Sequence, residues 1–167
     1  MLRRPEAAAD PALFAEALIV ASDVTLFTDM HTSLQLAEEA DAVADRHGDD
    51  RLLALSRATL AGVYYFAGEP ERAPPLAAES VQRARQLGDD VLLGYCLLQY
   101  ATCIGGAVYA EAFACTERSG DLGINRVLHN SVGCAALSMG ASRAPELIWK
   151  PQYRPQRRSD FQTPSSH

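Results

Sequence analysis

Apolar residues along this chain recur every three or four positions, which is the spacing of one face of an α-helix. Gly, Asp and Pro residues separate these segments, and they are the residues that end and begin helices. No stretch alternates between apolar and polar residues for long enough to predict a strand. We therefore predict an all-α protein, with helices at residues 11–25, 32–47, 50–67, 70–87, 90–104, 107–118 and 121–139.

The pattern is also repeated along the chain. Gly48-Asp49-Asp50 is repeated forty positions later as Gly88-Asp89-Asp90. A third copy begins at Gly120-Asp121, after an interval of only thirty-two positions. Glycine can adopt the left-handed backbone that ends a helix, and the aspartate that follows can accept hydrogen bonds from the free N–H groups of the next helix. These junctions predict a series of helix pairs, because each one closes a pair and opens the next.

Residues 57–73 resemble a tetratricopeptide repeat (TPR). Five positions stand where these repeats place Leu, a small residue, Tyr, Gly and Ala, namely Leu60, Ala61, Tyr64, Gly68 and Ala73. Residues 129–133 resemble the usual opening of such a repeat. The third copy departs from the pattern at Ala136, which replaces Tyr, and at Pro145, which replaces a small alanine. The resemblance implies a right-handed superhelix of antiparallel helix pairs, a TPR-like α-solenoid, over residues 11–140.

Long repeats with Gly-Asp-Asp junctions and Arg-rich helices also resemble the C-terminal helical arrays of AfsR/SARP-type and LuxR-type (MalT-like) bacterial transcriptional regulators. This resemblance implies a non-catalytic scaffold that binds a protein, a peptide or a small ligand, as a fragment of such a regulator. A stand-alone TPR adaptor is the alternative, and a small helical enzyme is a third. DNA-binding and ATPase domains would lie elsewhere in a full-length relative, because this chain has no G-x-x-x-x-G-K-[ST] loop.

Composition narrows the expected partners. The net charge of −6 argues against non-specific binding to nucleic acids or anionic membranes. No apolar run approaches the roughly 18 residues of a membrane span. The four cysteines form no C-x-x-C pair, so no zinc framework or redox motif is visible. We expect a cytoplasmic protein with reduced thiols, no cofactor, no metal, and no direct contact with nucleic acid or membrane.

The two ends differ from the repeats. We expect residues 1–10 to be disordered. Residues 141–167 contain four prolines and five basic residues against two acidic ones, which favours a disordered basic tail over a nucleic-acid contact. The periodic pattern stops abruptly after Gly140. We therefore expect a truncated reading frame, in which the unpartnered apolar face of helix 121–139 promotes self-association.

Three groups of residues contain side chains of catalytic or metal-binding type. The segment 47–50, His-Gly-Asp-Asp, contains metal-ligand types, but a helix end and cap explain it fully. Adjacent glutamates at Glu38-Glu39 point about 100° apart on a helix, which favours a solvated face over paired acid–base carboxylates. His129 and Cys134 are about 140° out of phase, so they do not form a nucleophile pair. Catalysis is not predicted for any of them.

The remaining candidates concern packing and binding. Cys96 and Cys103 share a helix face and are expected to be small core residues rather than ligands. Tyr64 is expected to lie in the interhelical core. The first helix of each copy is expected to line a concave groove that holds a protein or peptide partner. Its inner face should carry Tyr65, Tyr95, Thr102 and Asn130.

Overall fold

The structure of the protein is a computed structural model that describes residues 10–105, 108–120 and 123. Helices account for most of these residues, and the described part contains no strand, which confirms the all-helical prediction. The helices are α2 (Pro11–Thr25), α3 (Met30–His47), α4 (Asp50–Phe66), α5 (Ala73–Leu87), α6 (Asp90–Ile104) and α7 (Val108–Ser119). The predicted helix at 121–139 and the tail at 141–167 lie outside the described residues.

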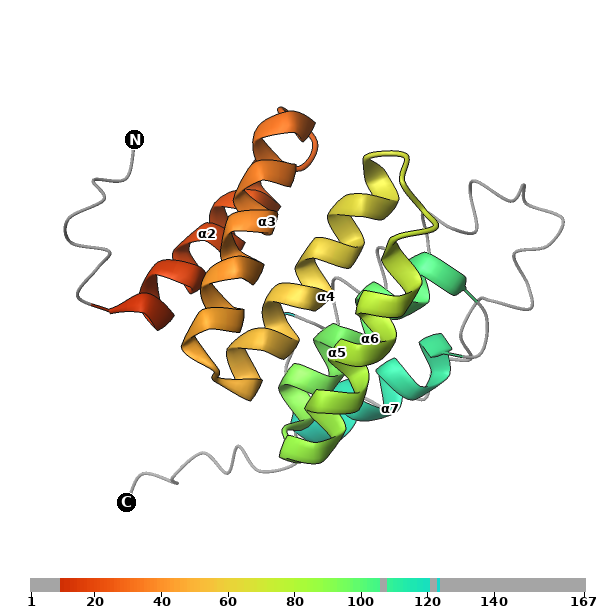
Figure 1. The fold of residues 1–167 in the computed structure, drawn as a ribbon. Helices are drawn as coiled ribbons and strands as arrows, with labels where there is room; N and C mark the ends of the chain where they lie inside the picture. Colours follow the sequence, from red (N-terminus) through yellow and green to blue (C-terminus); the bar gives the residue numbers. More distant parts are fainter. Residues whose placement is uncertain (1–9, 106–107, 121–122, 124–167) are drawn as a thin grey trace, which may run out of the picture.

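The helices pack as consecutive pairs, α2 with α3, α4 with α5, and α6 with α7 (Figure 1). The second helices of the first two pairs also contact the first helix of the next pair, so α3 packs on α4 and α5 packs on α6. In addition, α4 contacts both α2 and α6. The first helices of the three pairs are therefore neighbours.

The core continues from one pair to the next. One buried cluster joins α2, α3 and α4, a second joins α3, α4 and α5, and a third joins α4 to α7. Helix α4 contributes to all three, and eleven of its residues are buried. Because apolar burial is the main stabilising term, each pair in the described region is stabilised by its neighbour.

The predicted junction chemistry is confirmed. Gly48 and Gly88 end α3 and α5 with φ of 76° and 68°, in the left-handed region. Asp49 caps α4 by accepting a hydrogen bond from the backbone N–H of Leu52 at 2.8 Å. Asp89 accepts two such bonds at the start of α6. The same two residue types therefore end one helix and begin the next at both junctions.

Two helix starts differ from the prediction. Helix α3 begins at Met30 rather than at residue 32, because Asp29 caps it and accepts a hydrogen bond from the Thr32 N–H at 3.1 Å. Helix α5 begins at Ala73 rather than at residue 70. Two prolines, Pro74-Pro75, follow directly, and proline is tolerated only in the first turn of a helix, where its missing N–H is not needed.

Small buried residues mark where α2 crosses α3. The Ser22 and Ser33 hydroxyls are fully buried, and each donates to the other residue's backbone carbonyl at 3.0 Å. The caps Asp10 and Asp49 place α4 thirty-nine positions after α2, and this register matches Ser22 with Ala61. Ala61 is also fully buried. It is one of the small residues of the TPR resemblance.

We expect Gly88→Val to lower the free energy of unfolding by about 1–2 kcal/mol, measured by urea denaturation. No atom lies within 4 Å of a Cβ built on Gly88, so the loss comes from the positive φ alone. Gly88→Asn is the control, and it should cost less because asparagine tolerates the left-handed region. Equal stability of the valine variant and the wild-type protein would contradict this account.

Candidate binding face

Three of the four predicted binding residues lie along the boundary between α4 and α6. Tyr65 is on α4, and Tyr95 and Thr102 are on α6. Tyr109 of α7 lies close to two of them. Burial raises the pKa of its phenol, a hydrogen bond with Thr102 opposes that rise, and the nearby Tyr65 adds to it. The fourth predicted residue, Asn130, lies outside the described residues.

Tyr95 links the two helices rather than standing free. Its hydroxyl lies 2.9 Å from the Thr59 hydroxyl of α4. Burial raises the pKa of the Tyr95 phenol, while hydrogen bonds with Thr59 and Gln99 oppose that shift. The Gln99 amide in turn lies across Gly62, where a Cβ would collide with it. The absence of a side chain at Gly62 therefore lets α6 place this polar group against α4.

Asp23 of α2 belongs to the same surface, although it was not predicted. Its carboxylate is close enough to Tyr95 to contribute to the raised pKa of that phenol, after burial of the ring. Desolvation by the surrounding helices raises the pKa of Asp23 from 3.8 to about 6, even though the residue is exposed. Protein atoms on several sides of a solvent-accessible carboxylate produce this combination.

The repeat register could have found Asp23. Adding thirty-nine positions to Asp23 gives Gly62, and adding forty more gives Thr102, which was predicted. The three residues occupy the same position in the first helices of the three pairs. The predicted residues come from α4, α6 and the predicted helix 121–139, and the prediction did not carry the register back to α2.

An exposed aromatic cluster continues this surface at the carboxyl ends of α2 and α4. The rings of Phe27 and Phe66 meet edge to face with centroids 5.5 Å apart, and Phe66 meets Tyr65 in the same way at 5.4 Å. The exposed fractions are 79% for Phe27, 45% for Phe66 and 38% for Tyr65. We call the surface formed by these residues the α2–α4–α6 face; it comprises Asp23, Phe27, Tyr65, Phe66, Tyr95 and Thr102.

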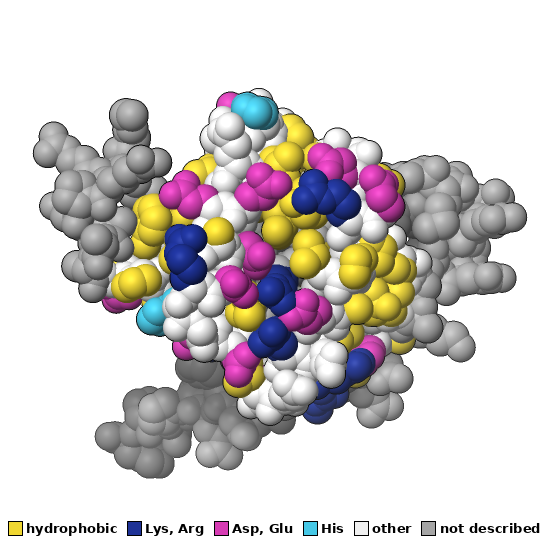
Figure 2. All heavy atoms as spheres, viewed as in Figure 1, with side chains coloured by type: hydrophobic (Ala, Val, Ile, Leu, Met, Phe, Trp, Pro, Cys, Tyr) yellow, Lys and Arg dark blue, Asp and Glu magenta, His cyan; other side chains and the backbone are white. Residues whose placement is uncertain are grey.

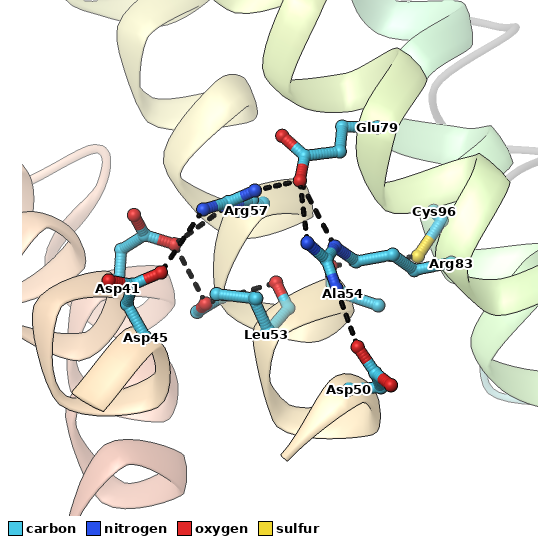
Figure 3. A network of polar contacts seen from close by, with 10 residues as sticks. Asp41, Asp45, Asp50, Leu53, Ala54, Arg57, Glu79, Arg83 and Cys96 are labelled. Carbon is cyan, nitrogen blue, oxygen red and sulfur yellow. Dashed lines mark hydrogen bonds and ion pairs between the residues drawn. The ribbon is translucent and has the colours of Figure 1, made fainter. Parts of the chain in front are cut away.

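A second polar cluster lies between α3, α4 and α5 and is structural. Arg57 of α4 is 17% exposed and lies between Asp41 and Asp45 of α3 and Glu79 of α5 (Figure 3). Glu79 also accepts hydrogen bonds from Arg83. Figure 2 shows acidic and basic side chains intermixed over these three helices. The charges are paired across helix boundaries, so this cluster joins α3, α4 and α5.

The predicted packing residues lie where expected. Cys96 is fully buried, and burial raises the pKa of its thiol to about 12. Burial raises the pKa of the partly buried Cys103 to about 11. A thiolate is the reactive form of cysteine, and at neutral pH both thiols are protonated. Tyr64 is 3% exposed, which confirms its core position, and its hydroxyl donates to Glu38 at 2.9 Å.

The other segments with side chains of catalytic or metal-binding type have structural roles or lie outside the described residues. Residues 47–50 form the helix end and cap described above. Within the described part of the chain, no group of three or more His, Cys, Asp or Glu side chains is placed to hold a metal ion. Glu39 is exposed, as expected for a solvated helix face, and Glu38 is exposed apart from its contact with Tyr64. His129 and Cys134 lie outside the described residues.

Neither a scan against protein-family models nor a search of curated proteins finds a match for this chain. Among the described helices, none is both long enough and apolar enough to cross a bilayer. The functional interpretation therefore depends on the α2–α4–α6 face itself. Its side chains offer aromatic contact area, hydroxyl groups and one carboxylate, which suit recognition of another molecule.

We expect Asp23→Asn to raise the melting temperature at pH 7. The folded state raises the carboxyl pKa from 3.8 to about 6, so ionised Asp23 opposes folding. The stability that its protonation contributes is fully present below about pH 4 and is lost as the pH rises through 6. The advantage of the asparagine variant should therefore shrink as the pH falls from 7 to 4. A constant difference in melting temperature across this range would contradict the shifted pKa.

Proposed function

We propose that this protein is a TPR-like repeat scaffold that binds a protein or peptide partner on the α2–α4–α6 face. The observation that carries the proposal is the exposed cluster of Phe27, Phe66 and Tyr65 at the ends of two neighbouring first helices. Exposed aromatic side chains that gather on one surface are typical of sites where proteins bind partners. The proposal assigns this face a binding role without catalysis.

The packing of the helices supports the scaffold part of the proposal. A repeat solenoid stacks each helix pair on its neighbour and buries a core that runs through the stack. In the described region, α3 and α5 each pack on two first helices, and the core clusters overlap from α2 to α7. This order fits a right-handed superhelix in which α2, α4 and α6 line the inner surface.

The resemblance to AfsR/SARP-type and LuxR-type regulators extends the proposal to a regulatory context. In that context, the scaffold would receive a signal as partner binding and pass it to domains elsewhere in a regulator. A stand-alone adaptor would need no such domains. The coding DNA on either side of this reading frame distinguishes the two, because a DNA-binding domain or further repeats encoded there favour the regulator.

We expect Tyr65→Ala to weaken peptide binding at least about tenfold, because truncation of a buried aromatic anchor at an interface costs about 2 kcal/mol. The full chain is used to select binders from a displayed library of random twelve-residue peptides, and affinities of the selected peptides are measured by fluorescence anisotropy. Val91→Ala is the control. Val91 is 39% exposed against 38% for Tyr65, but it lies outside the α2–α4–α6 face at the start of α6.

Circular dichroism should show unchanged helix content in both variants. If Tyr65→Ala and Val91→Ala change the affinity of the selected peptides equally, or if the library yields no binder, the proposed binding role of this face is wrong.

A further inference from the structure

Asp23 is a carboxylate without a countercharge. Within the described part of the chain, no hydrogen bond or ion pair reaches its side chain, and the group that feels its charge is the neutral phenol of Tyr95. Two turns earlier on the same helix, Glu16 lies 3.7 Å from Arg51. Acidic side chains on α3 and α5, such as Asp41 and Glu79, also face arginine. Asp23 therefore differs from them.

The helices that form this face provide no internal partner for Asp23. Helices α2 and α6 contain no lysine or arginine. Helix α4 contains two arginines, and both are engaged elsewhere. Arg51 lies near Glu16 and Asp89, and Arg57 lies between α3 and α5. The described part of the α2–α4–α6 face therefore carries negative charge that is not neutralised from within.

The unpaired carboxylate adjoins the aromatic cluster. Phe27 follows Asp23 by four residues, just past the end of α2 at Thr25. Because the C-cap Leu26 keeps a helical backbone, Phe27 begins about one helical turn, or roughly 5.4 Å, beyond Asp23. Phe27 in turn contacts Phe66 across the gap between α2 and α4. A carboxylate beside exposed rings is complementary to a basic group next to an apolar one, and aromatic faces also attract cations.

We propose that the partner is a cationic peptide segment, in which a lysine or arginine pairs with Asp23 and a neighbouring aromatic or large aliphatic side chain packs on Phe27, Phe66 and Tyr65. The distance of about one helical turn requires the two side chains to lie within about four residues of each other in the partner, two in an extended segment or three to four in a helix. This inference rests on the proposed function and adds to it the chemistry of the partner.

The random twelve-residue library selected on the full chain tests the inference directly. The selected peptides should be enriched in lysine or arginine placed two to four residues from an aromatic or large aliphatic residue. Asp23→Asn, which keeps the shape and removes the charge, should weaken these peptides about tenfold or more. Glu39→Gln is the matched control, because it removes one negative charge from an exposed position on α3 and should change affinity less than twofold.

A charge exchange gives a second measurement that does not depend on one variant. The Asp23→Lys protein should lose the basic peptide and bind the same peptide with its key basic residue changed to glutamate. The proposal of a cationic partner is wrong if the selected peptides lack basic residues. It is also wrong if Asp23→Asn and Glu39→Gln change the affinity equally. If Tyr65→Ala still weakened those peptides, the proposed binding face would stand. If Tyr65→Ala also left the affinity of those peptides unchanged, both the cationic partner and the proposed binding face would be wrong.

Discussion

Replacing Arg57 with methionine should lower the free energy of unfolding by about 3 kcal/mol, the effect expected for removal of one partner from a largely buried ionic cluster. The guanidinium is 17% exposed and lies between carboxylates of α3 and α5. Burial raises the pKa of Asp41, and Arg57 opposes that shift. Without Arg57, Asp41 and Glu79 would face each other across α4 with less compensation. Urea denaturation at pH 7 measures the loss.

Arg51→Met is the matched control for this prediction. Arg51 is on the same helix, but it is 53% exposed and lies 3.6 to 3.7 Å from its acidic partners. Exposed ion pairs contribute about 0–1 kcal/mol, so this variant should retain nearly the full stability. If Arg51→Met and Arg57→Met lowered the free energy of unfolding equally, the burial of Arg57 between α3 and α5 would not be the cause of its effect. Arg57→Lys should be intermediate, because one ammonium cannot reach both sides as a planar guanidinium does.

Ser22→Val should lower the free energy of unfolding by about 2–4 kcal/mol, the combined effect of overpacking and of a lost buried hydrogen bond. Ser22 is fully buried where α2 crosses α3, and its hydroxyl donates to the Ser33 carbonyl at 3.0 Å. Valine adds branched methyl groups at this fully buried contact between the two helices and leaves that carbonyl without its donor. Thermal and urea denaturation should agree on the loss.

The alanine double variant is the informative control. Ser22→Ala with Ser33→Ala removes both hydroxyls together. The free energy of unfolding should change little, because replacing both partners of a hydrogen bond with apolar groups of similar shape is close to neutral. The second helix pair shows that such a crossing is feasible, because Ala61 and Ala73 are both fully buried in one cluster there. A loss as large as that of Ser22→Val would mean that hydrogen bonding, rather than close approach, holds α2 against α3.

Local signals in the sequence predicted the helices and their junctions because those signals act over a few residues. Gly48 and Asp49 determine a helix end and a helix start through their own backbone and side chain. The start of α3 was missed because no Gly or Pro separates Asp29 from α2, so its capping role is not evident from spacing alone. The start of α5 was missed because its proline pair was not weighed as a first-turn signal.

The candidate face was only partly predictable. Tyr65 and Thr102 follow from helical phase within one repeat, whereas Asp23 requires the register between repeats. The contact between Phe27 and Phe66 depends on how α2 and α4 approach each other, which no local pattern specifies. The same is true of the position of Arg57 between α3 and α5. Pairings between distant segments depend on packing geometry, and one sequence by itself does not contain it.

The bond between Tyr95 and Thr59 has a mechanical consequence for any occupant of this surface. The two hydroxyls connect the first helices of the second and third pairs, and they also belong to or border the region where a partner would lie. A partner that accepts the Tyr95 proton competes with Thr59 and removes one link that sets the distance between α4 and α6. By linkage, the factor by which the partner favours the separated hydroxyls equals the factor by which their separation raises the affinity for the partner. The spacing of α4 and α6 and the occupancy of the α2–α4–α6 face are then two readouts of one equilibrium.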